Sequence, residues 1–336
     1  MGAMEATDGA AAQGKITDVP GLRVGQEQKT DGGWLSGVTV VLPPPGTAGS
    51  VDVRGGGPAT HETDALDATA LVSTVDAVVL TGGSAYGLVS ARGVQRWCEE
   101  QGRGFAVEGG VVPIVPGAAI FDLGRGGDFS ARPDEAMGFA AAAAAGAETE
   151  GHDVGRGNVG AGTGALLGRR QFKGGVGTAS ITLEDVSPEG PVVVGALAVV
   201  NALGMKFSPP VEPDLDKPDQ DQPNQQGGMP PLNTTLVVVA TNAVLDKAEC
   251  KRTASAAHAG IARALHPSHT LADGDVVFSL ATGQAPLDRS TDEARYVSLI
   301  TLQSAAADVV RSAILDGISS AETVTTPAGT FPAYGA

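Results

Sequence analysis

The sequence predicts a mixed α/β protein in which helices cover the outer faces of two packed β-sheets. Residues 77–80, 236–240 and 276–280 form short, uncharged and almost continuously apolar segments. Strands of this kind need both faces covered, so we expect a layer on either side of them. Apolar residues at helical spacing in 88–98 and 254–265 indicate the covering helices.

Length and composition narrow the class of protein. A chain of 336 residues could hold about two domains, but large mixed sandwiches reach this size as one, and we expect a single domain. Apolar residues make up 42% and aromatic residues only 4%, so the core must be aliphatic. A net charge of −16 without a block of Lys or Arg argues against nucleic acid and membrane surfaces as partners.

Two features bear on location. Cys98 and Cys250 are the only cysteines, which supports neither a disulfide framework nor a thiolate metal site and fits a reducing setting. Residues 1–14 lack the pattern of a signal peptide, and no apolar run approaches the ~20 residues of a spanning helix. We therefore expect a cytoplasmic protein.

The first part of the chain alternates short strands with glycine-rich turns. Gly55-Gly56-Gly57 either lets the backbone approach a ligand or forms a mobile loop. Residues 81–87 turn the strand at 77–80 into a helix, as in a phosphate site, but neither the dinucleotide nor the P-loop pattern is present. Ser84 also fails as a nucleophile elbow, because Tyr86 stands where that motif needs glycine. The other strands expected here lie at residues 22–25, 37–42 and 51–54.

The middle of the chain predicts a helix from Pro133, a dense glycine stretch at 157–164 and a hairpin of strands 178–183 and 191–201. Asn201 ends the second strand of the hairpin. A side-chain amide at that position can donate a hydrogen bond to an oxyanion, although it more often caps the turn.

The sharpest change in character comes before residue 236. Residues 208–229 have the composition of a linker, and an uncharged β-branched strand begins soon after them. Thr234 stands on the boundary, directly after Asn233. Its hydroxyl would become a nucleophile if the chain were cut between these residues, because the freed α-amine, with a pKa of about 7.7–8.0, could act as its base. The alternative is that Asn233-Thr234-Thr235 only opens a core strand.

Asp273 and Asp275 stand at the entrance of the next strand. They are either turn residues or, if they lie near Thr234, groups that orient its ammonium or hydroxyl. Residues 305–315 predict a further helix. A metal site is not expected, because no acidic residue stands at ligand spacing beside the histidines of this region, His258, His266 and His269.

Taken together, these segments resemble the family of self-processing L-aminopeptidase/D-esterases and β-peptidyl aminopeptidases, including its nylon-oligomer (6-aminohexanoate oligomer) hydrolases. The resemblance runs from Ile16 to about Thr282 and rests on the order and spacing of several motifs. Asn233-Thr234-Thr235 and Asp273-Gly274-Asp275 are the most specific. The others are Ile16 to Gly21, Arg54-Gly55-Gly56, Glu62-Thr63-Asp64, Leu80 to Leu88, Gly157 to Gly164 and Lys173-Gly174-Gly175.

The resemblance implies a four-layer αββα sandwich like that of N-terminal-nucleophile hydrolases. It also implies self-cleavage after Asn233 into a large chain, 1–233, and a small chain, 234–336. No metal or cofactor is needed, and the assembly is expected to be a homotetramer. The implied catalytic residues are the nucleophile Thr234, the oxyanion donor Asn201, and the supporting pair Asp273 and Asp275.

The chain departs from the family at two positions that bear on substrate binding. Phe121 stands where a tyrosine helps to bind the reacting group, so that contact is either missing or supplied by another residue, with Tyr86 as the candidate. Arg169 stands where the nylon-oligomer hydrolases have an active-site lysine, and arginine does not release its proton. Lys173 is a possible substitute.

The sequence leaves the substrate class open. A threonine nucleophile and two aspartates match the nylon-oligomer hydrolases better than the aminopeptidases, which use serine. We therefore expect hydrolysis of linear 6-aminohexanoate oligomers, short peptides or both. The alternatives are an aminopeptidase or β-peptidyl aminopeptidase that releases N-terminal residues, and a non-catalytic sandwich protein that binds a small ligand.

Overall fold

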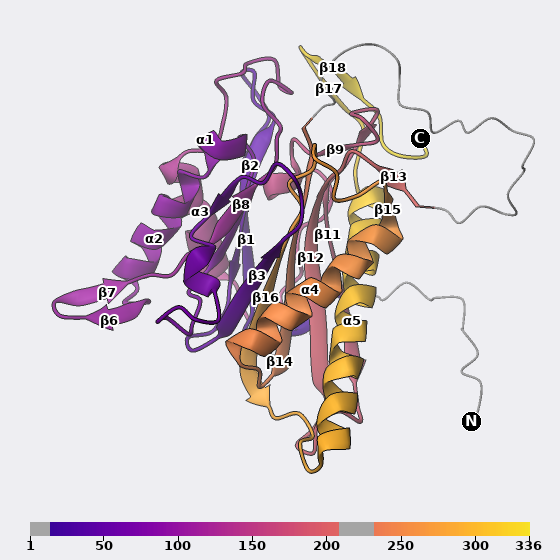
Figure 1. Ribbon diagram of the computed structural model, residues 1–336. Helices are drawn as coiled ribbons and strands as arrows, with labels where there is room; N and C mark the ends of the chain where they lie inside the picture. The colour runs from indigo at the N-terminus through magenta and orange to yellow at the C-terminus, as the bar shows by residue number, and fades with distance from the viewer. Residues whose placement is uncertain (1–13, 208–231) are drawn as a thin grey trace, which may run out of the picture.

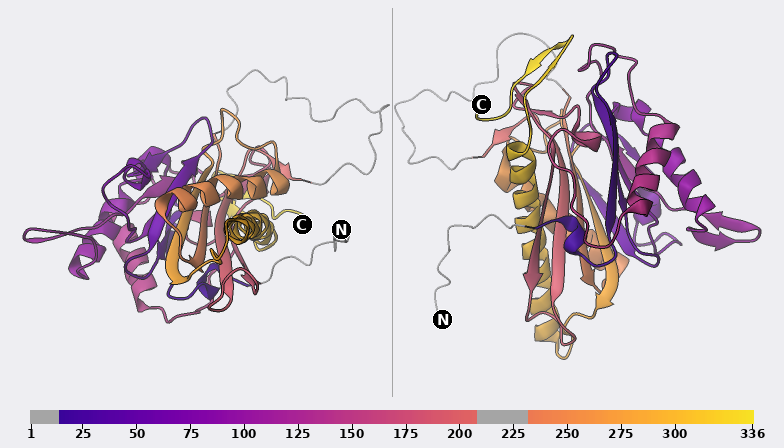
Figure 2. Two further views of the ribbon diagram at one scale, coloured as in Figure 1. Left: turned by 60° about the horizontal axis from the view of Figure 1, so that its bottom comes forward. Right: turned by 180° about the vertical axis from the view of Figure 1, so that it is seen from behind.

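The computed structural model describes residues 14–207 and 232–336, which form two five-stranded sheets packed face to face with helices outside them (Figures 1 and 2). The predicted linker, 208–229, lies outside the described residues. The first sheet contains, in order, β1 (Arg23–Lys29), β2 (Ser36–Leu42), β5 (Val78–Thr81), β8 (Gly117–Ala119) and β4 (Thr60–His61). The second contains β11 (Val176–Leu183), β12 (Val192–Asn201), β14 (Thr234–Ala243), β16 (Val276–Ala285) and β3 (Ala48–Val53).

Helices cover both outer faces, as Figure 1 shows. The first sheet carries α2 (Ser90–Glu100) and α3 (Glu135–Ala147), with the short α1 (Ser84–Gly87) nearby, and the second carries α4 (Lys247–Ala264) and α5 (Asp292–Ser319). Two hairpins stand apart from the large sheets: β6 (Phe105–Val107) with β7 (Gly110–Val112), and β17 (Val324–Thr326) with β18 (Gly329–Phe331). Two short strand pairs are β9 (Leu166–Leu167) with β10 (Phe172–Lys173), and β13 (Met205–Lys206) with β15 (Leu265–His266). The 3-10 turns are η1 (Ile16–Asp18), η2 (Asp64–Leu66) and η3 (Gly160–Gly162).

The apolar strands supply two different cores. In β14, Leu236 and Val238 face the other sheet and pack in the central core with Phe278 of β16. Val237 and Val239 point the opposite way, into the core beneath α4 and α5. Because side chains alternate along a strand, an unbroken apolar run fills both layers at once. The predicted αββα sandwich is confirmed.

Helix α5 is much longer than the helix predicted at 305–315. It begins at Asp292, behind the N-cap Thr291, whose hydroxyl accepts the Ala294 N–H at 3.1 Å. Its first turns expose apolar side chains as well as polar ones, among them Tyr296, Val297 and Ile300, so the sequence there does not show one apolar face. Within the described residues α5 alone has the length and mean hydropathy (1.2) of a membrane span, but 56% of its most apolar stretch is buried, as in a core helix.

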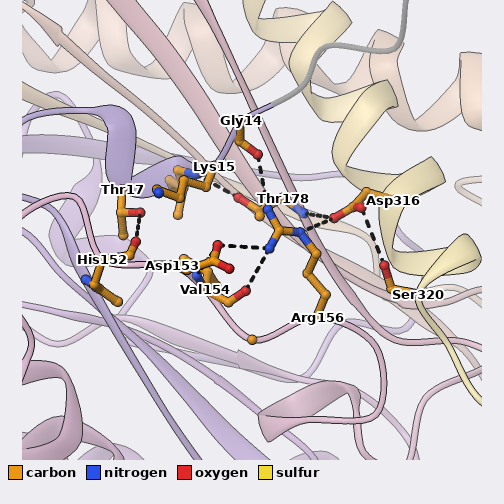
Figure 3. A network of polar contacts seen from close by, with 12 residues as sticks. Gly14, Lys15, Thr17, His152, Asp153, Val154, Arg156, Thr178, Asp316 and Ser320 are labelled. Atoms are coloured by element: carbon orange, nitrogen blue, oxygen red, sulfur yellow. Dashed lines mark hydrogen bonds and ion pairs between the residues drawn. The ribbon is translucent and has the colours of Figure 1, made fainter.

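Arg156 joins three distant segments (Figure 3). Its guanidinium donates to Asp316 of α5 at 3.1 Å, to Asp153 at 3.0 Å and to the Gly14 carbonyl at 3.4 Å. Asp316 also accepts the Thr178 N–H of β11 at 2.9 Å. These contacts fix the end of α5 and the start of the described chain against the edge strand of the second sheet.

Strand order in the second sheet decides where the candidate residues meet. Because β12 is antiparallel to β14, the end of β12 lies beside the start of β14, and Asn201 pairs directly with Thr234. Because β16 runs parallel to β14, the residues that precede β16 reach the same edge, where Asp273 bridges Asn233. Three segments separated by more than thirty residues each therefore converge on one end of the sheet.

Candidate active site

Thr234 opens β14 at the polar end of the central core and is only 3% exposed. Its hydroxyl donates to the carbonyl oxygen of Asn233 at 2.5 Å, and the Gly274 N–H donates to the same oxygen at 2.9 Å. A Cβ on Gly274 would lie 2.6 Å from Thr234 Oγ1, so only glycine permits this approach. The peptide bond between Asn233 and Thr234 is thus held with a hydroxyl and a backbone donor on its carbonyl oxygen.

Asn201 lies beside Thr234 and is fully buried. Its Oδ1 accepts hydrogen bonds from Arg125 Nη1 at 2.6 Å and from the Leu166 N–H at 3.1 Å. Its Nδ2 has no hydrogen-bond partner among the described residues. Directly paired residues of antiparallel strands point to the same face, so this amide donor belongs to the same face of the sheet as the Thr234 hydroxyl.

Asp273 and Asp275 occupy the other side of Thr234. Asp275 Oδ1 accepts the Thr235 N–H at 2.7 Å, and its Oδ2 accepts the backbone and ring N–H groups of His269 at 3.0 and 2.8 Å. Asp273 Oδ2 accepts the N–H and hydroxyl of Thr270 at 2.9 and 2.6 Å. Burial, and then the charge of Asp275, raise the pKa of the Asp273 carboxyl.

The glycine-rich loop after β3 packs against these acids. The N–H groups of Gly55 and Gly57 donate to the carbonyl oxygens of Asp275 and Asp273 at 3.2 and 2.8 Å. A Cβ on Gly55 would lie 2.3 Å from Asp275 N, so the loops could not meet this closely with a larger residue. The sequence offered a ligand contact or a mobile loop here, whereas in the structure the glycines approach the loop that carries the acids.

Four further side chains were candidates for substrate contact. Lys173 is fully buried, and its ammonium donates to the carbonyl oxygens of Gly162, Ala165 and Gly174 at 2.7–2.9 Å. Burial holds the pKa of Lys173 well below its ordinary value. Lys173 therefore holds together the loop that precedes Leu166. The Leu166 N–H in turn donates to Asn201.

The remaining candidates lie nearer the surface. Arg169 is exposed, in a turn with φ of 56°. Phe121 is partly buried, and the Arg170 guanidinium lies 5.7 Å from its ring centre. Tyr86 in α1 is 56% exposed beneath the Arg132 guanidinium, 3.9 Å from its ring centre. Within the described residues no hydrogen bond joins these three side chains to Thr234, so their roles in binding stay predictions.

Sequence reasoning missed Arg125 and its neighbour Asp122. Both are buried, in the turn that follows β8 of the first sheet. Asp122 accepts hydrogen bonds from Ser36 Oγ at 2.7 Å and from the Gly83 N–H at 2.6 Å. Burial lowers the pKa of Arg125 to about 9 and raises that of Asp122. Two opposite charges three residues apart beside an apolar run were the available signal.

His258 and His269 were also missed as neighbours of the acids. Their rings are in edge-to-face contact, with centres 4.8 Å apart. His258 Nε2 contacts the Asp52 carbonyl oxygen at 3.0 Å, and burial lowers its pKa to about 4. Among the described residues no group of three His, Cys, Asp or Glu side chains is arranged to hold a metal ion.

The αββα sandwich therefore brings a hydroxyl, an amide and two carboxyl groups together where three strand ends meet. The chain belongs to peptidase family S58, whose sequence profile matches residues 14–331. It is therefore a hydrolase that acts on peptide or amide bonds.

Relatives of two kinds share most of its length. It is 46% identical over 348 residues to an uncharacterized aminopeptidase of Mycobacterium tuberculosis, covering 95% of this chain and 96% of the relative. It is 48% identical over 354 residues to an uncharacterized aminopeptidase of Mycobacterium leprae, with 96% of each covered. A 6-aminohexanoate-oligomer endohydrolase of Paenarthrobacter ureafaciens is 29% identical over 327 residues, covering 89% of this chain and 84% of that protein.

Solved structures agree on the fold. A β-aminopeptidase from Burkholderia sp. superposes with a TM-score of 0.72 at 24% identity, covering 97% of this chain and 93% of the other. An L-aminopeptidase D-Ala-esterase/amidase from Ochrobactrum anthropi, described as a variant of the Ntn-hydrolase fold, superposes with a TM-score of 0.72 at 23% identity, covering 96% and 92%. At this identity the match supports the shared architecture.

Proposed function

We propose that the protein is a self-processing amide hydrolase whose mature nucleophile is the N-terminal threonine Thr234. The observation that carries the proposal is the position of this hydroxyl. It contacts the Asn233 carbonyl oxygen and lies between the Asn201 amide and the Asp273–Asp275 loop. The alternative, a threonine that only opens a strand, does not account for the neighbouring Asn201 Nδ2, which is buried and has no hydrogen-bond partner among the described residues.

Processing would use the groups already in contact. Thr234 Oγ attacks the Asn233 carbonyl carbon, the C–N bond breaks, and the Thr234 nitrogen takes up the hydroxyl proton and leaves as an amine. The Gly274 N–H, 2.9 Å from the carbonyl oxygen, stabilises the negative charge that develops there. Water then hydrolyses the ester between Asn233 and Thr234, which yields a carboxylate on 1–233 and a free α-amine on 234–336.

Turnover would use the same hydroxyl a second time. The α-amine, with an ordinary pKa of about 7.7–8.0, takes the hydroxyl proton as Oγ attacks the substrate amide. Asn201 Nδ2 donates to the oxyanion, and the amine returns the proton to the leaving nitrogen. In deacylation the α-amine takes a proton from water as the water oxygen attacks the ester carbonyl carbon. The ester C–O bond then breaks, and the amine returns the proton to Thr234 Oγ.

The substrate class follows from the charge around the nucleophile. Two buried carboxyl groups beside Thr234 favour a substrate that carries an ammonium group, such as a short peptide or a linear 6-aminohexanoate oligomer. The 46–48% identical relatives named aminopeptidases favour release of N-terminal residues, whereas the threonine nucleophile and acid pair favour the oligomer hydrolases. Membership in a peptidase family removes the non-catalytic alternative.

The first experiment is the mass of the purified protein under denaturing conditions. We expect two pieces, 1–233 and 234–336, that stay together when native because β14 is buried between its neighbours. Thr234→Ala should remain one piece, whereas Thr234→Ser and the matched control Thr235→Val should be cut. Cleavage of Thr234→Ala at the same bond would show that another group cuts the chain.

A second experiment separates the substrate classes. The processed enzyme receives equal amounts of an aminohexanoate trimer and an amino-acid p-nitroanilide. Hydrolysis of the trimer assigns it to the oligomer hydrolases, and release from the anilide alone assigns it to the aminopeptidases. The native mass of the same sample tests the proposed tetramer, which a mass of one processed protomer would overturn.

A further inference from the structure

We propose that Arg125 is a positioning residue that fixes the side-chain amide of Asn201 with its Nδ2 turned toward the reaction centre at Thr234. This rests on the proposed function, in which Asn201 Nδ2 stabilises the oxyanion. Arg125 lies in the turn that follows β8 of the first sheet and Asn201 ends β12 of the second, so their contact joins the two layers at the end of the central core.

The contacts of Asn201 determine which way its amide faces. Its Oδ1 receives hydrogen bonds from Arg125 Nη1 and from the Leu166 backbone N–H. Both neighbours can only donate, so a flipped amide would set N–H groups against N–H groups. The oxygen must therefore face Arg125 and Leu166, and the two N–H groups of Nδ2 must face away from them.

Arg125 is itself held in place. Besides Asn201, its Nη1 donates to the Gly164 carbonyl oxygen, and its own carbonyl oxygen accepts the Thr326 hydroxyl at 2.7 Å. Asp122, three residues earlier, supplies the opposite charge. A planar guanidinium held through Nη1, on a residue whose backbone carbonyl is also hydrogen-bonded, presents that N–H in one direction. With a pKa of about 9 it stays protonated at neutral pH.

Stability alone does not account for this arginine. It is 5% exposed, and its Nε and Nη2 have no hydrogen-bond partner among the described residues. A buried charge with unpaired donors destabilises a fold relative to an apolar residue of similar size. Its presence beside Asn201, whose Nδ2 has no partner within residues 14–207 and 232–336, is explained if it orients that amide.

The test compares Arg125→Met, Arg125→Lys and Asn201→Ala, alone and combined, as turnover per processed active site. We expect Arg125→Met to lower kcat about 10- to 100-fold with KM nearly unchanged, since it removes orientation and not a substrate contact. Arg125→Lys, which can still donate to one acceptor, should recover part of that loss. The Arg125→Met change should add little in an Asn201→Ala background, because both act through one amide.

Arg103→Met is the matched structural control. Arg103 also donates to two backbone carbonyl oxygens, those of Pro43 and Asp76, but does not touch the site. Its substitution should lower the melting temperature and leave kcat unchanged. If Arg125→Met behaves the same way while Asn201→Ala is impaired, or if the two losses multiply, Arg125 does not act through Asn201. If Asn201→Ala keeps full kcat, the oxyanion role itself is overturned.

Discussion

The two flanks of Thr234 are built on opposite principles. On one side the Asn201 amide has its oxygen bound by two donors and its nitrogen unpartnered within residues 14–207 and 232–336. On the other side Asp275 uses both carboxylate oxygens to accept hydrogen bonds from Thr235 and His269. The amide flank therefore keeps a donor available, whereas the acceptors of the carboxylate flank are already occupied by N–H groups of the protein.

This difference assigns separate duties to the flanks. An unpartnered donor in a buried site can stabilise charge that appears only during the reaction. Carboxylates tied to backbone N–H groups instead hold the 269–275 loop in register with β14 and supply negative charge near the Thr234 nitrogen. Changes on the amide flank should therefore act on kcat, and changes on the carboxylate flank should act on stability and pH dependence as well.

The largest effect is expected from Asn201→Asp, which keeps the shape of the side chain and replaces its only donor by an oxygen. We expect kcat to fall by about 10²–10³ or more. Stability should not fall, because the new carboxylate would pair with Arg125. Steady-state kinetics and thermal unfolding measure both. A variant with near-normal kcat would remove the contrast between the flanks.

On the carboxylate flank, we expect stability to depend on pH through His258, whose ring contacts His269. Burial lowers the pKa of His258 from 6.5 to about 4, so between these values the unfolded chain binds more protons than the folded one. The contribution of His258 to the free energy of unfolding is complete above pH 6.5. It falls by about 3 kcal/mol as the pH drops towards 4.

Denaturant unfolding at pH 7.5 and pH 4.5 checks this, in a Thr234→Ala background so that one chain unfolds. His258→Phe keeps a ring against His269 and removes the titration. It should flatten the pH dependence relative to the parent. Parallel curves for the two proteins would mean that His258 is not the group responsible.

Asp273→Asn should lower turnover about tenfold, a loss of about 1.4 kcal/mol, by removing negative charge beside the nucleophile. The pKa of Asp273 is raised in the fold, so its ionised form costs stability as the pH rises through that pKa. The amide variant should therefore be at least as stable as the parent at pH 7.

Asp275→Asn is the matched comparison. It replaces an acceptor of three N–H donors with a group that carries its own N–H, so it should lose stability where Asp273→Asn does not. Thermal unfolding of the two variants side by side provides the measurement. Equal melting temperatures would contradict the division of duties between the two acids.

The smallest effect concerns His269, whose ring N–H donates to Asp275 Oδ2 from a residue with φ of 57°. Asparagine offers a donor at a similar position and tolerates this backbone conformation, whereas leucine does neither. We expect His269→Asn to stay within about threefold of the parent in turnover, and His269→Leu to lie about fivefold below His269→Asn. Equal activity would show that the Nδ1 donor is not needed.

Much of the site was readable in the sequence because its residues mark element boundaries. Thr234 stands where a polar segment becomes an apolar strand, Asn201 where such a strand ends, and Asp273 with Asp275 where the next begins. Local composition sets these boundaries, since burial of an uncharged β-branched run selects a strand with both faces covered. The layers of the sandwich follow from the same runs.

Other features needed the tertiary structure. Arg125 lies in a glycine-rich turn 76 residues before Asn201, and its spacing from Asp122 does not tell which strand end its guanidinium reaches. The loop at Gly55 could be assigned to its contact with Asp275 only once β3 was known to pair with β16.

The sequence by itself determined which residue types stand at the strand ends, because local burial and turn chemistry act on neighbours along the chain. Only the tertiary structure decided which strand ends meet, since antiparallel pairing of β12 with β14 and parallel pairing of β14 with β16 bring Asn201, Thr234 and Asp275 together. It also decided which side of the Asn201 amide is left to donate, because the two donors that orient it come from other parts of the chain.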